Sequence, residues 1–224
     1  MERVINFVHV GGNPLSDLNK RCIKSWQEHL PNYKIKQWDE TNFDVSSNKF
    51  CKQALECGAY AFASDYMRLK TIYDNGGIYM DTDVEVTQNF DKFLDCPAFI
   101  GLETPPIRMA SCVIGAKKKS TFVENWLSFY NDASFIGEDG ALNLKPNTHT
   151  ITEISHIRYP RLKLNDTIER FSDLTVFPVE YFSPFNRKTQ ELNATENTHA
   201  IHRFAGSWLH FREMQKLTTA DKTK

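Results

Sequence analysis

Asp81 and Asp83 are the residues whose types and spacing point most directly to chemistry. They fall within residues 78–86, where apolar neighbours predict a β-strand. Alternate side chains of a strand share a face, so we expect both carboxylates on one side, with Cα atoms roughly 7 Å apart. Two negative charges so close need a counter-charge, and Mn²⁺ or Mg²⁺ prefers such oxygen ligands. A cation there would hold a diphosphate and stabilise it as a leaving group.

The triplet Asp81-Thr82-Asp83 is a weak signal when it stands alone, because a solvated strand end can carry the same residues. Its surroundings strengthen it. Gly76-Gly77 separates a predicted helix from the strand, and the apolar neighbours indicate an interior strand. Carboxylates at the end of a central strand lie where α/β folds bind their ligands.

Asp65 and Arg68 are three residues apart on a helix predicted over residues 60–75, so they face the same way. In isolation the pair favours a simple intrahelical ion pair. The alternative is a carboxylate for sugar hydroxyls beside a guanidinium for phosphate or sugar oxygens. Near the C-terminus, His202 precedes Gly206-Ser207-Trp208. A single histidine on a strand is usually a hydrogen-bonding partner, but at this place His202 could complete the protein ligands of the cation.

The elements that must position these residues begin with a strand, a helix and a strand, at residues 4–10, 16–30 and 33–38. That order is the start of an α/β domain with a parallel sheet. Further predicted helices cover residues 48–57, 60–75, 121–130 and 150–157. Further predicted strands cover residues 78–86, 98–102, 111–116, 175–177 and 199–204.

The composition limits the classes of protein to consider. The 224 residues suffice for one domain with a sizeable core, and the formal net charge of -1 argues against a nucleic-acid-binding protein. No apolar run reaches the ~20 residues that span a bilayer. The N-terminus lacks the layout of a signal peptide, and the five cysteines show no CxxC pair, so we expect a cytoplasmic protein with reduced thiols.

Several runs resemble the DXD-containing glycosyltransferases of the sugar-binding-region family. These runs are residues 5–12, 38–44, 61–68, 76–79, 81–83, 196–202 and 206–208, together with Tyr73. The family includes bacterial capsule and lipopolysaccharide transferases and is related to the yeast initiating α-1,6-mannosyltransferase. The clostridial glucosylating toxins are more distantly similar. The resemblance spans most of the chain.

The resemblance implies a GT-A fold, in which helices flank a Rossmann-like nucleotide-sugar-binding sheet. We expect one such domain over residues 1–217, followed by a polar tail over residues 218–224. The resemblance also implies that Asp83 binds Mn²⁺ or Mg²⁺ directly, that Asp81 reaches the cation through water or an oxygen, and that His202 is a further ligand.

The resemblance assigns the donor site as well. Asp65 and Arg68 would hold the donor sugar, and Asp81 would contact the ribose or the sugar. Ser207 and Trp208 would contact the diphosphate and close over it.

The chain departs from the family pattern at its start. The family usually has His at the position of Asn6 and Trp at the position of His9, where the Trp stacks on the nucleotide base. His9 can stack there too, with a smaller area. Arg203 stands where many relatives have a second His, so it either helps to hold the diphosphate or is a surface residue.

These features predict a retaining glycosyltransferase that uses a nucleotide sugar, a UDP-sugar by expectation. The predicted acceptor is a glycan or lipid-linked saccharide of surface polysaccharide synthesis. One alternative is a metal-dependent phosphate-ester or diphosphate hydrolase, which would need more converging carboxylates. The other is a non-catalytic nucleotide-sugar-binding module.

Two further segments leave their roles open. Glu103 ends a predicted strand and either faces the acceptor or has no role in the chemistry. Lys117-Lys118-Lys119 is typical of a solvated turn, and its alternative is peripheral contact with the inner face of an anionic membrane, where lipid-linked acceptors lie.

Overall fold

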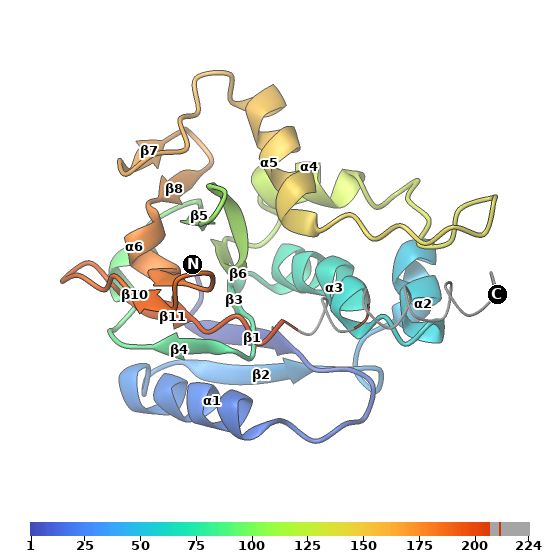
Figure 1. Ribbon diagram of the computed structural model, residues 1–224, viewed down its shortest axis with the longest axis horizontal. Coiled ribbons are helices and arrows are strands. Elements are labelled where there is room, and N and C mark those ends of the chain that lie inside the picture. Colours follow the sequence, from blue (N-terminus) through green and yellow to red (C-terminus); the bar gives the residue numbers. More distant parts are fainter. Residues whose placement is uncertain (207–210, 212–224) are drawn as a thin grey trace.

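The computed structural model describes residues 1–206 and residue 211, and it has the α/β fold class expected from the sequence (Figure 1). The strands are β1 (Val4–Val8), β2 (Lys34–Trp38), β3 (Gly77–Met80), β4 (Val84–Val86), β5 (Ala98–Glu103), β6 (Arg108–Ala116), β7 (Glu169–Arg170), β8 (Thr175–Phe177), β9 (Phe185–Asn186), β10 (Glu191–Leu192) and β11 (Ala200–His202). The helices are α1 (Asp17–His29), α2 (Lys49–Glu56), α3 (Tyr60–Asn75), α4 (Thr121–Ser128), α5 (Asn147–Arg158) and α6 (Val179–Phe182), with 3-10 turns η1 (Val45–Ser47) and η2 (Asp91–Phe93).

Seven strands form the central sheet in the order β2-β1-β3-β6-β5-β8-β7. The first three are parallel, as the opening strand-helix-strand pattern predicts, and β5 pairs with β8 in parallel. The other pairings are antiparallel, so the sheet is mixed. The cause is local: only residues 104–107 separate β5 from β6, and so short a connection returns the chain in the opposite direction.

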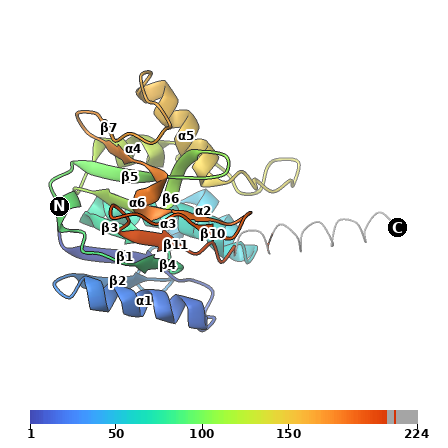
Figure 2. The same ribbon diagram turned by 60° about the vertical axis from the view of Figure 1, so that its left-hand side comes forward.

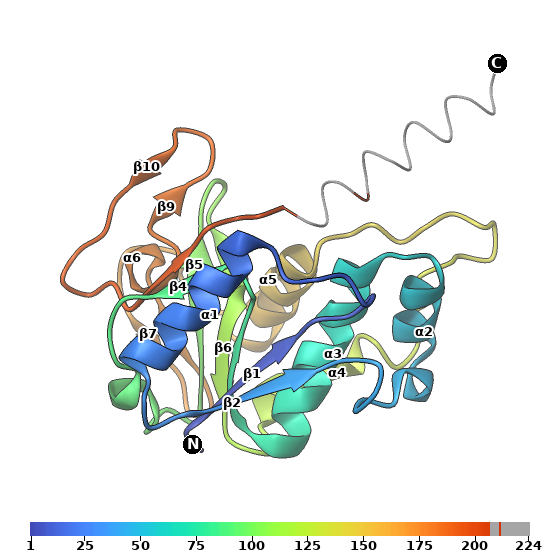
Figure 3. The same ribbon diagram turned by 90° about the horizontal axis from the view of Figure 1, so that it is seen from below.

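Helices cover both faces of this sheet. Each face has its own apolar core, and consecutive side chains of β3 point to opposite faces. Ile78 packs in one core with Trp26 of α1, and Tyr79 packs in the other core with Met67 of α3. In Figure 3, α1 lies in front of the sheet and α5 behind it. Figure 2 shows α5 and β7 on the side of the molecule opposite α1. The fold therefore has three layers, with the sheet between two apolar cores.

Helix α1 begins where the sequence predicts. The hydroxyl of Ser16 accepts from the backbone N–H of Asn19, and the Asn19 side chain accepts from the backbone N–H of Ser16. This reciprocal capping satisfies two donors at the helix start. Cys22 and Trp26 are buried at helical spacing, and Trp26 Nε1 donates to the carbonyl of Val84 at 2.6 Å. Helix α1 thus holds β4, the strand that follows the acidic triplet.

The turn between α3 and β3 depends on Gly77. Its φ is +94°, and a Cβ there would lie 2.7 Å from the carbonyl oxygen of Val4, so a side chain would collide with β1. The side chain of Asn6 donates to the Gly76 carbonyl at 3.2 Å and accepts from Trp38 Nε1 at 2.9 Å. Asn6 is buried, and its two hydrogen bonds secure this turn.

The single strand expected over residues 78–86 is wrong, because the chain turns at residues 81–83. The Asp81 N–H donates to the carbonyl of Cys112 at 2.9 Å, and the Val84 N–H then donates to the carbonyl of Asp81 at 3.0 Å. Beyond the turn, β4 leaves the central sheet and pairs antiparallel with β11. The triplet therefore ends a central strand, as expected, but it does not present two carboxylates from one strand face.

The later elements follow the expectation with shifted boundaries. Helix α5 starts at Asn147, three residues before the predicted start, and β11 is shorter than residues 199–204. The five cysteines are free. No helix in the described part of the chain has the length and hydropathy required to cross a membrane. The predicted tail at residues 218–224 lies outside the described residues.

Candidate active site

Asp81, Asp83 and His202 come together at the carboxyl end of β3. One side-chain ligand atom from each lies within 4.8 Å of the others, and His202 Nε2 is 3.5 Å from Asp83 Oδ2. Antiparallel pairing of β11 with β4 sets His202 opposite Val84, next to the acidic turn. Two carboxylates and one imidazole form a donor set that fits Mn²⁺ or Mg²⁺. The three residues that the sequence predicts as metal ligands are therefore neighbours.

Asp83 is held in its ionised form. Burial raises the pKa of Asp83, but the His202 ring and the backbone N–H of Ala205 lower it by more than burial raises it. The resulting pKa is about 2, below the ordinary value of an aspartate. That N–H donates to Asp83 Oδ2 at 2.7 Å, and the Arg203 N–H donates to the main-chain oxygen of Asp83. A buried, fixed carboxylate is a ready ligand for a divalent cation.

Arg68 links helix α3 to the acidic turn. Its guanidinium is 6% exposed and lies 3.1 Å from Asp81 Oδ1 and 3.0 Å from Asp65 Oδ1. It also donates to the carbonyl of Ser111 at 2.9 Å. The intrahelical pair with Asp65 is therefore present, and the same guanidinium carries positive charge to the site. Its planar fork of donors holds the two carboxylates in a fixed geometry, which the rotating ammonium of a lysine would not impose.

Asp65 is fixed from a second direction by Asn147, which the sequence reasoning missed. Asn147 Nδ2 donates to Asp65 Oδ1 at 2.6 Å, and Ser111 Oγ donates to Asn147 Oδ1 at 2.9 Å. Burial raises the pKa of Asp65 to about 7, although Arg68 opposes the rise. Pro146 is the N-cap of α5 and Asn147 its first residue, three residues before the predicted start of the helix.

Tyr79 is a second contributor that the sequence reasoning left without a role of its own. Its hydroxyl donates to Asp81 Oδ1 at 2.8 Å, and the guanidinium carbon of Arg68 lies 4.8 Å from its ring centroid. Burial raises the pKa of Asp81, while Arg68 lowers it. Asp81 thus has two fixed donors that orient its carboxylate.

Glu103 ends β5 at the same end of the sheet. Burial raises its pKa, and the charges of His202 and Asp81 also act on it. Glu103 is therefore close enough to the acidic turn for these charges to act on its carboxyl group. Its role toward the acceptor stays a prediction.

The side chains of His9 and Arg203 contact other groups, and two further expected site residues lie outside the described residues. His9 is partly exposed, and its Nε2 lies 2.7 Å from the Asn13 carbonyl oxygen, within the loop that follows β1. Arg203 forms an ion pair with Glu85 at 2.6 Å. Ser207 and Trp208 lie outside the described residues, so their contacts with the diphosphate stay predictions.

Part of the chain, including most of the residues around the acidic turn, is similar to a known protein family. Residues 16–100 match the family model described as glycosyltransferase sugar-binding region containing DXD motif. The matched segment includes Asp65, Arg68 and the triplet Asp81-Thr82-Asp83, and it ends before His202. The match confirms the family resemblance for this segment. The closer relationships to capsule and lipopolysaccharide transferases and to clostridial toxins stay predictions.

One curated relative is the glucan organizing enzyme 1 of Cryptococcus neoformans var. grubii serotype A. It is 31% identical over 80 residues, which cover 32% of this chain and 22% of the relative. The match thus spans about a fifth of that relative's length.

Two solved structures match this chain to different degrees. The PaToxG glycosyltransferase superposes with a TM-score of 0.54 at 17% identity, covering 71% of this chain and 70% of that one. A glycosyltransferase involved in glycosylation of the major capsid of PBCV-1 gives a TM-score of 0.47 at 12% identity, covering 95% and 98%. The first shows that the fold is of the GT-A type. The family segment supports sugar transfer in general, and the structural likeness supports the fold.

Proposed function

We propose that this chain is a metal-dependent, retaining glycosyltransferase that moves a sugar from a UDP-sugar to a glycan or lipid-linked acceptor of surface polysaccharide synthesis. The observation that carries the proposal is the meeting of Asp81, Asp83 and His202 beside the buried guanidinium of Arg68. We further propose that residues 1–217 form one catalytic domain. The cytoplasmic location stays a prediction.

The proposed metal site separates the roles of the two aspartates. Asp83, with its low pKa, and His202 would bind Mn²⁺ or Mg²⁺ directly, and Asp81 would complete the site or contact the ribose. When bound, the cation would neutralise the charge that develops on the departing diphosphate. Arg68 adds a fixed positive charge next to Asp81, and such preorganised charge favours the transition state.

The proposed donor-sugar site contains Asp65 and Asn147. Both side chains are buried, and the bond between them fixes the direction of the Asp65 carboxylate. Asp65 Oδ1 also contacts Arg68, so this oxygen is engaged on the protein side. This arrangement favours a carboxylate that accepts from sugar hydroxyls over one that attacks the anomeric carbon. Retention would then follow from attack by the acceptor hydroxyl on the leaving-group side, with a phosphate oxygen as the proton acceptor.

Product analysis tests this function. Wild-type protein, Asp83→Ala and Asp132→Ala, an exposed-aspartate control, would be incubated with labelled UDP-sugars, Mn²⁺ and a panel of glycan acceptors. We expect a glycosylated product with the wild type and the control, and near-complete loss with Asp83→Ala. Proton NMR of the new linkage would report retention or inversion.

Other outcomes would support the two alternatives. Free sugar at the same rate with and without every acceptor, together with turnover of simple phosphate esters, would favour a hydrolase. Tight binding of the donor with no turnover would favour a binding module.

A further inference from the structure

Phe204 has a backbone conformation that a bulky side chain rarely adopts. Its φ is +51°, in the left-handed region, where the Cβ atom lies too close to the following carbonyl oxygen. Among the described residues, Lys119 and Gln190 are the other non-glycine residues with a positive φ, and both are exposed turn residues. Phe204 is partly buried and follows His202 by two residues. Strain of this kind persists only where the surrounding structure holds it, and it is common at functional sites.

Two backbone hydrogen bonds hold the chain on either side of Phe204. The Arg203 N–H donates to the main-chain oxygen of Asp83 at 2.9 Å, and the Ala205 N–H donates to Asp83 Oδ2 at 2.7 Å. Asp83 thus accepts from both neighbours of Phe204 and keeps the backbone in the left-handed conformation. A glycine would adopt this conformation without strain, so the presence of a phenylalanine needs a reason of its own.

The ring of Phe204 packs directly on the ring of His202. The two ring centroids are 3.9 Å apart, and the ring planes are tilted by 33°. No other pair of rings among the described residues is closer; the next, Tyr159 and Phe171, are 4.5 Å apart. A ring packed so closely on one face of an imidazole restricts its rotation. The strained backbone therefore places a group that limits how His202 can turn.

His202 lacks the hydrogen bond that usually orients a metal-binding histidine. Such a histidine generally donates from its second ring nitrogen to a carboxylate, a carbonyl or water. Nε2 of His202 faces Asp83 Oδ2 at 3.5 Å, whereas Nδ1 is buried and has no hydrogen-bond partner among the described residues. The thiol of Cys112 lies near the ring, but a thiol is a weak partner, and its Sγ is also 3.4 Å from Ser183 Oγ. Packing must then supply the orientation.

We propose that Phe204 is a positioning residue, whose ring holds the imidazole of His202 in the orientation that binds the divalent cation. This role rests on the proposed function, because it requires His202 to be a metal ligand. The backbone of residues 203–205 holds Asp83, and the side chain in the middle of the same segment holds His202. One short segment would thus arrange two of the three proposed metal ligands.

Mn²⁺ affinity in the presence of UDP separates the role of the ring from that of the backbone. Phe204→Gly removes the ring but accepts the positive φ, so the two bonds to Asp83 can remain. Phe204→Tyr keeps an aromatic ring at this position. Electron paramagnetic resonance of free Mn²⁺ gives the affinity of each full-length variant. Thermal unfolding without metal confirms that each variant is folded.

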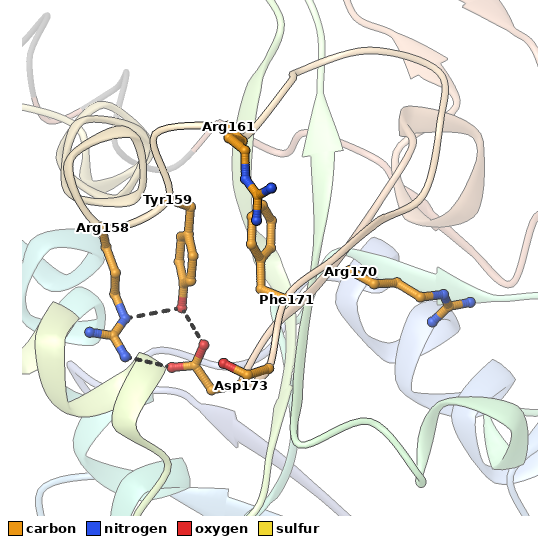
Figure 4. A pocket seen from close by; sticks show the side chains of 7 residues that line it. Arg158, Tyr159, Arg161, Arg170, Phe171 and Asp173 are labelled. Atoms are coloured by element: carbon orange, nitrogen blue, oxygen red, sulfur yellow. Dashed lines mark hydrogen bonds and ion pairs between the residues drawn. The ribbon is translucent and has the colours of Figure 1, made fainter.

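Phe171 provides the matched control. It is also partly buried, and its ring is tilted by 39° against that of Tyr159. Figure 4 shows Phe171 beside Tyr159, in the turn that joins β7 to β8. Strand β8 runs in the same direction as β3, because β6 is antiparallel to β3 and β5, and β5 is parallel to β8. Phe171 precedes β8 whereas Asp81 follows β3, so Phe171→Gly removes a similar ring contact at the opposite end of the sheet.

We expect Phe204→Gly to weaken Mn²⁺ binding roughly tenfold, the lower end of the range for losing a group that orients a metal ligand. Phe204→Tyr and Phe171→Gly should bind Mn²⁺ as the wild type does. Wild-type affinity in Phe204→Gly would overturn the proposal, and so would an equal loss in Phe171→Gly.

A double variant tests whether Phe204 acts through His202. In a protein that already carries His202→Ala, Phe204→Gly should cause no further loss of Mn²⁺ affinity, because the ring that it positions is gone. A further loss of similar size would mean that Phe204 acts on another group and would overturn the proposal. Failure of the wild type to bind Mn²⁺ at all is a different result: it would refute the proposed metal site and this role with it.

Discussion

Asn147 Nδ2 lies 2.6 Å from Asp65 Oδ1 and joins the first residue of α5 to the middle of α3, 82 residues earlier in the chain. Asn147 also accepts from Ser111, whose carbonyl accepts from Arg68. A closed set of buried polar groups thus orients the carboxylate that we assign to the donor sugar. Such sets are sensitive to the loss of one member, because the remaining groups stay buried without partners.

The first prediction concerns Asn147. Asn147→Ala removes the donor that fixes Asp65, and a hydrogen bond to a charged group contributes about 1.5–3 kcal/mol. We expect the affinity for the nucleotide sugar to fall roughly 10- to 100-fold. Titration calorimetry with the nucleotide sugar and Mn²⁺ measures this affinity. Thr148→Ala, one residue along α5, is the control and should bind as the wild type does; equal affinities for all three proteins would contradict the role of Asn147.

The second prediction concerns pH. Burial raises the pKa of Asp65 to about 7 from an ordinary value of 3.8, so between these values the folded protein keeps a proton that the unfolded chain has released. The stabilisation from this proton is complete below the ordinary pKa and is lost as pH rises through the folded pKa. Wild-type protein should therefore lose more thermal stability than Asp65→Asn between about pH 5 and about pH 8. Parallel stability curves for the two proteins would contradict the raised pKa.

The third prediction concerns Arg68 as the link between two carboxylates. Arg68→Met leaves Asp65 and Asp81 buried without their shared cation, a loss expected to cost about 3–5 kcal/mol. Urea unfolding measures the change. Lys70→Met on the same helix removes a more exposed pair with Asp74, which should cost at most about 1 kcal/mol. Similar losses for both variants would mean that Arg68 is not a buried link.

The fourth prediction concerns His202 as a metal ligand. His202→Ala should weaken binding of Mn²⁺ in the presence of UDP by at least roughly tenfold, because one of three protein ligands is removed. Electron paramagnetic resonance of free Mn²⁺ gives the affinity directly. His156→Ala, at an exposed position on α5, should leave it unchanged. Unaltered Mn²⁺ affinity in His202→Ala would remove this residue from the metal site.

The sequence predicts best those elements whose ends and faces are set by neighbouring residues. Ser16 caps α1 as expected, and α3 ends at Gly76 because the next backbone positions require a positive φ. The spacing of Asp65 and Arg68 on α3 correctly placed both on one helix face. The family resemblance brought His202 to the acidic triplet, a pairing that no local pattern contains.

The errors arise where contacts between distant residues decide the conformation. The break after Met80 depends on the Cys112 carbonyl and on pairing of β4 with β11, so the alternating pattern of residues 78–86 could not reveal it. Asn147 gains its role from Asp65, which lies on another helix. Both are long-range effects, and periodicity within a short window carries no information about them.

The central claim is that the acidic turn binds a nucleotide sugar through a divalent cation. Thermal unfolding would be followed for the wild type and Asp83→Ala with a panel of nucleotide sugars, each with and without Mn²⁺. The account predicts that one UDP-sugar stabilises the wild type only when Mn²⁺ is present, and that Asp83→Ala abolishes the shift. Absence of any shift in the wild type, or a shift of equal size in Asp83→Ala, would contradict it.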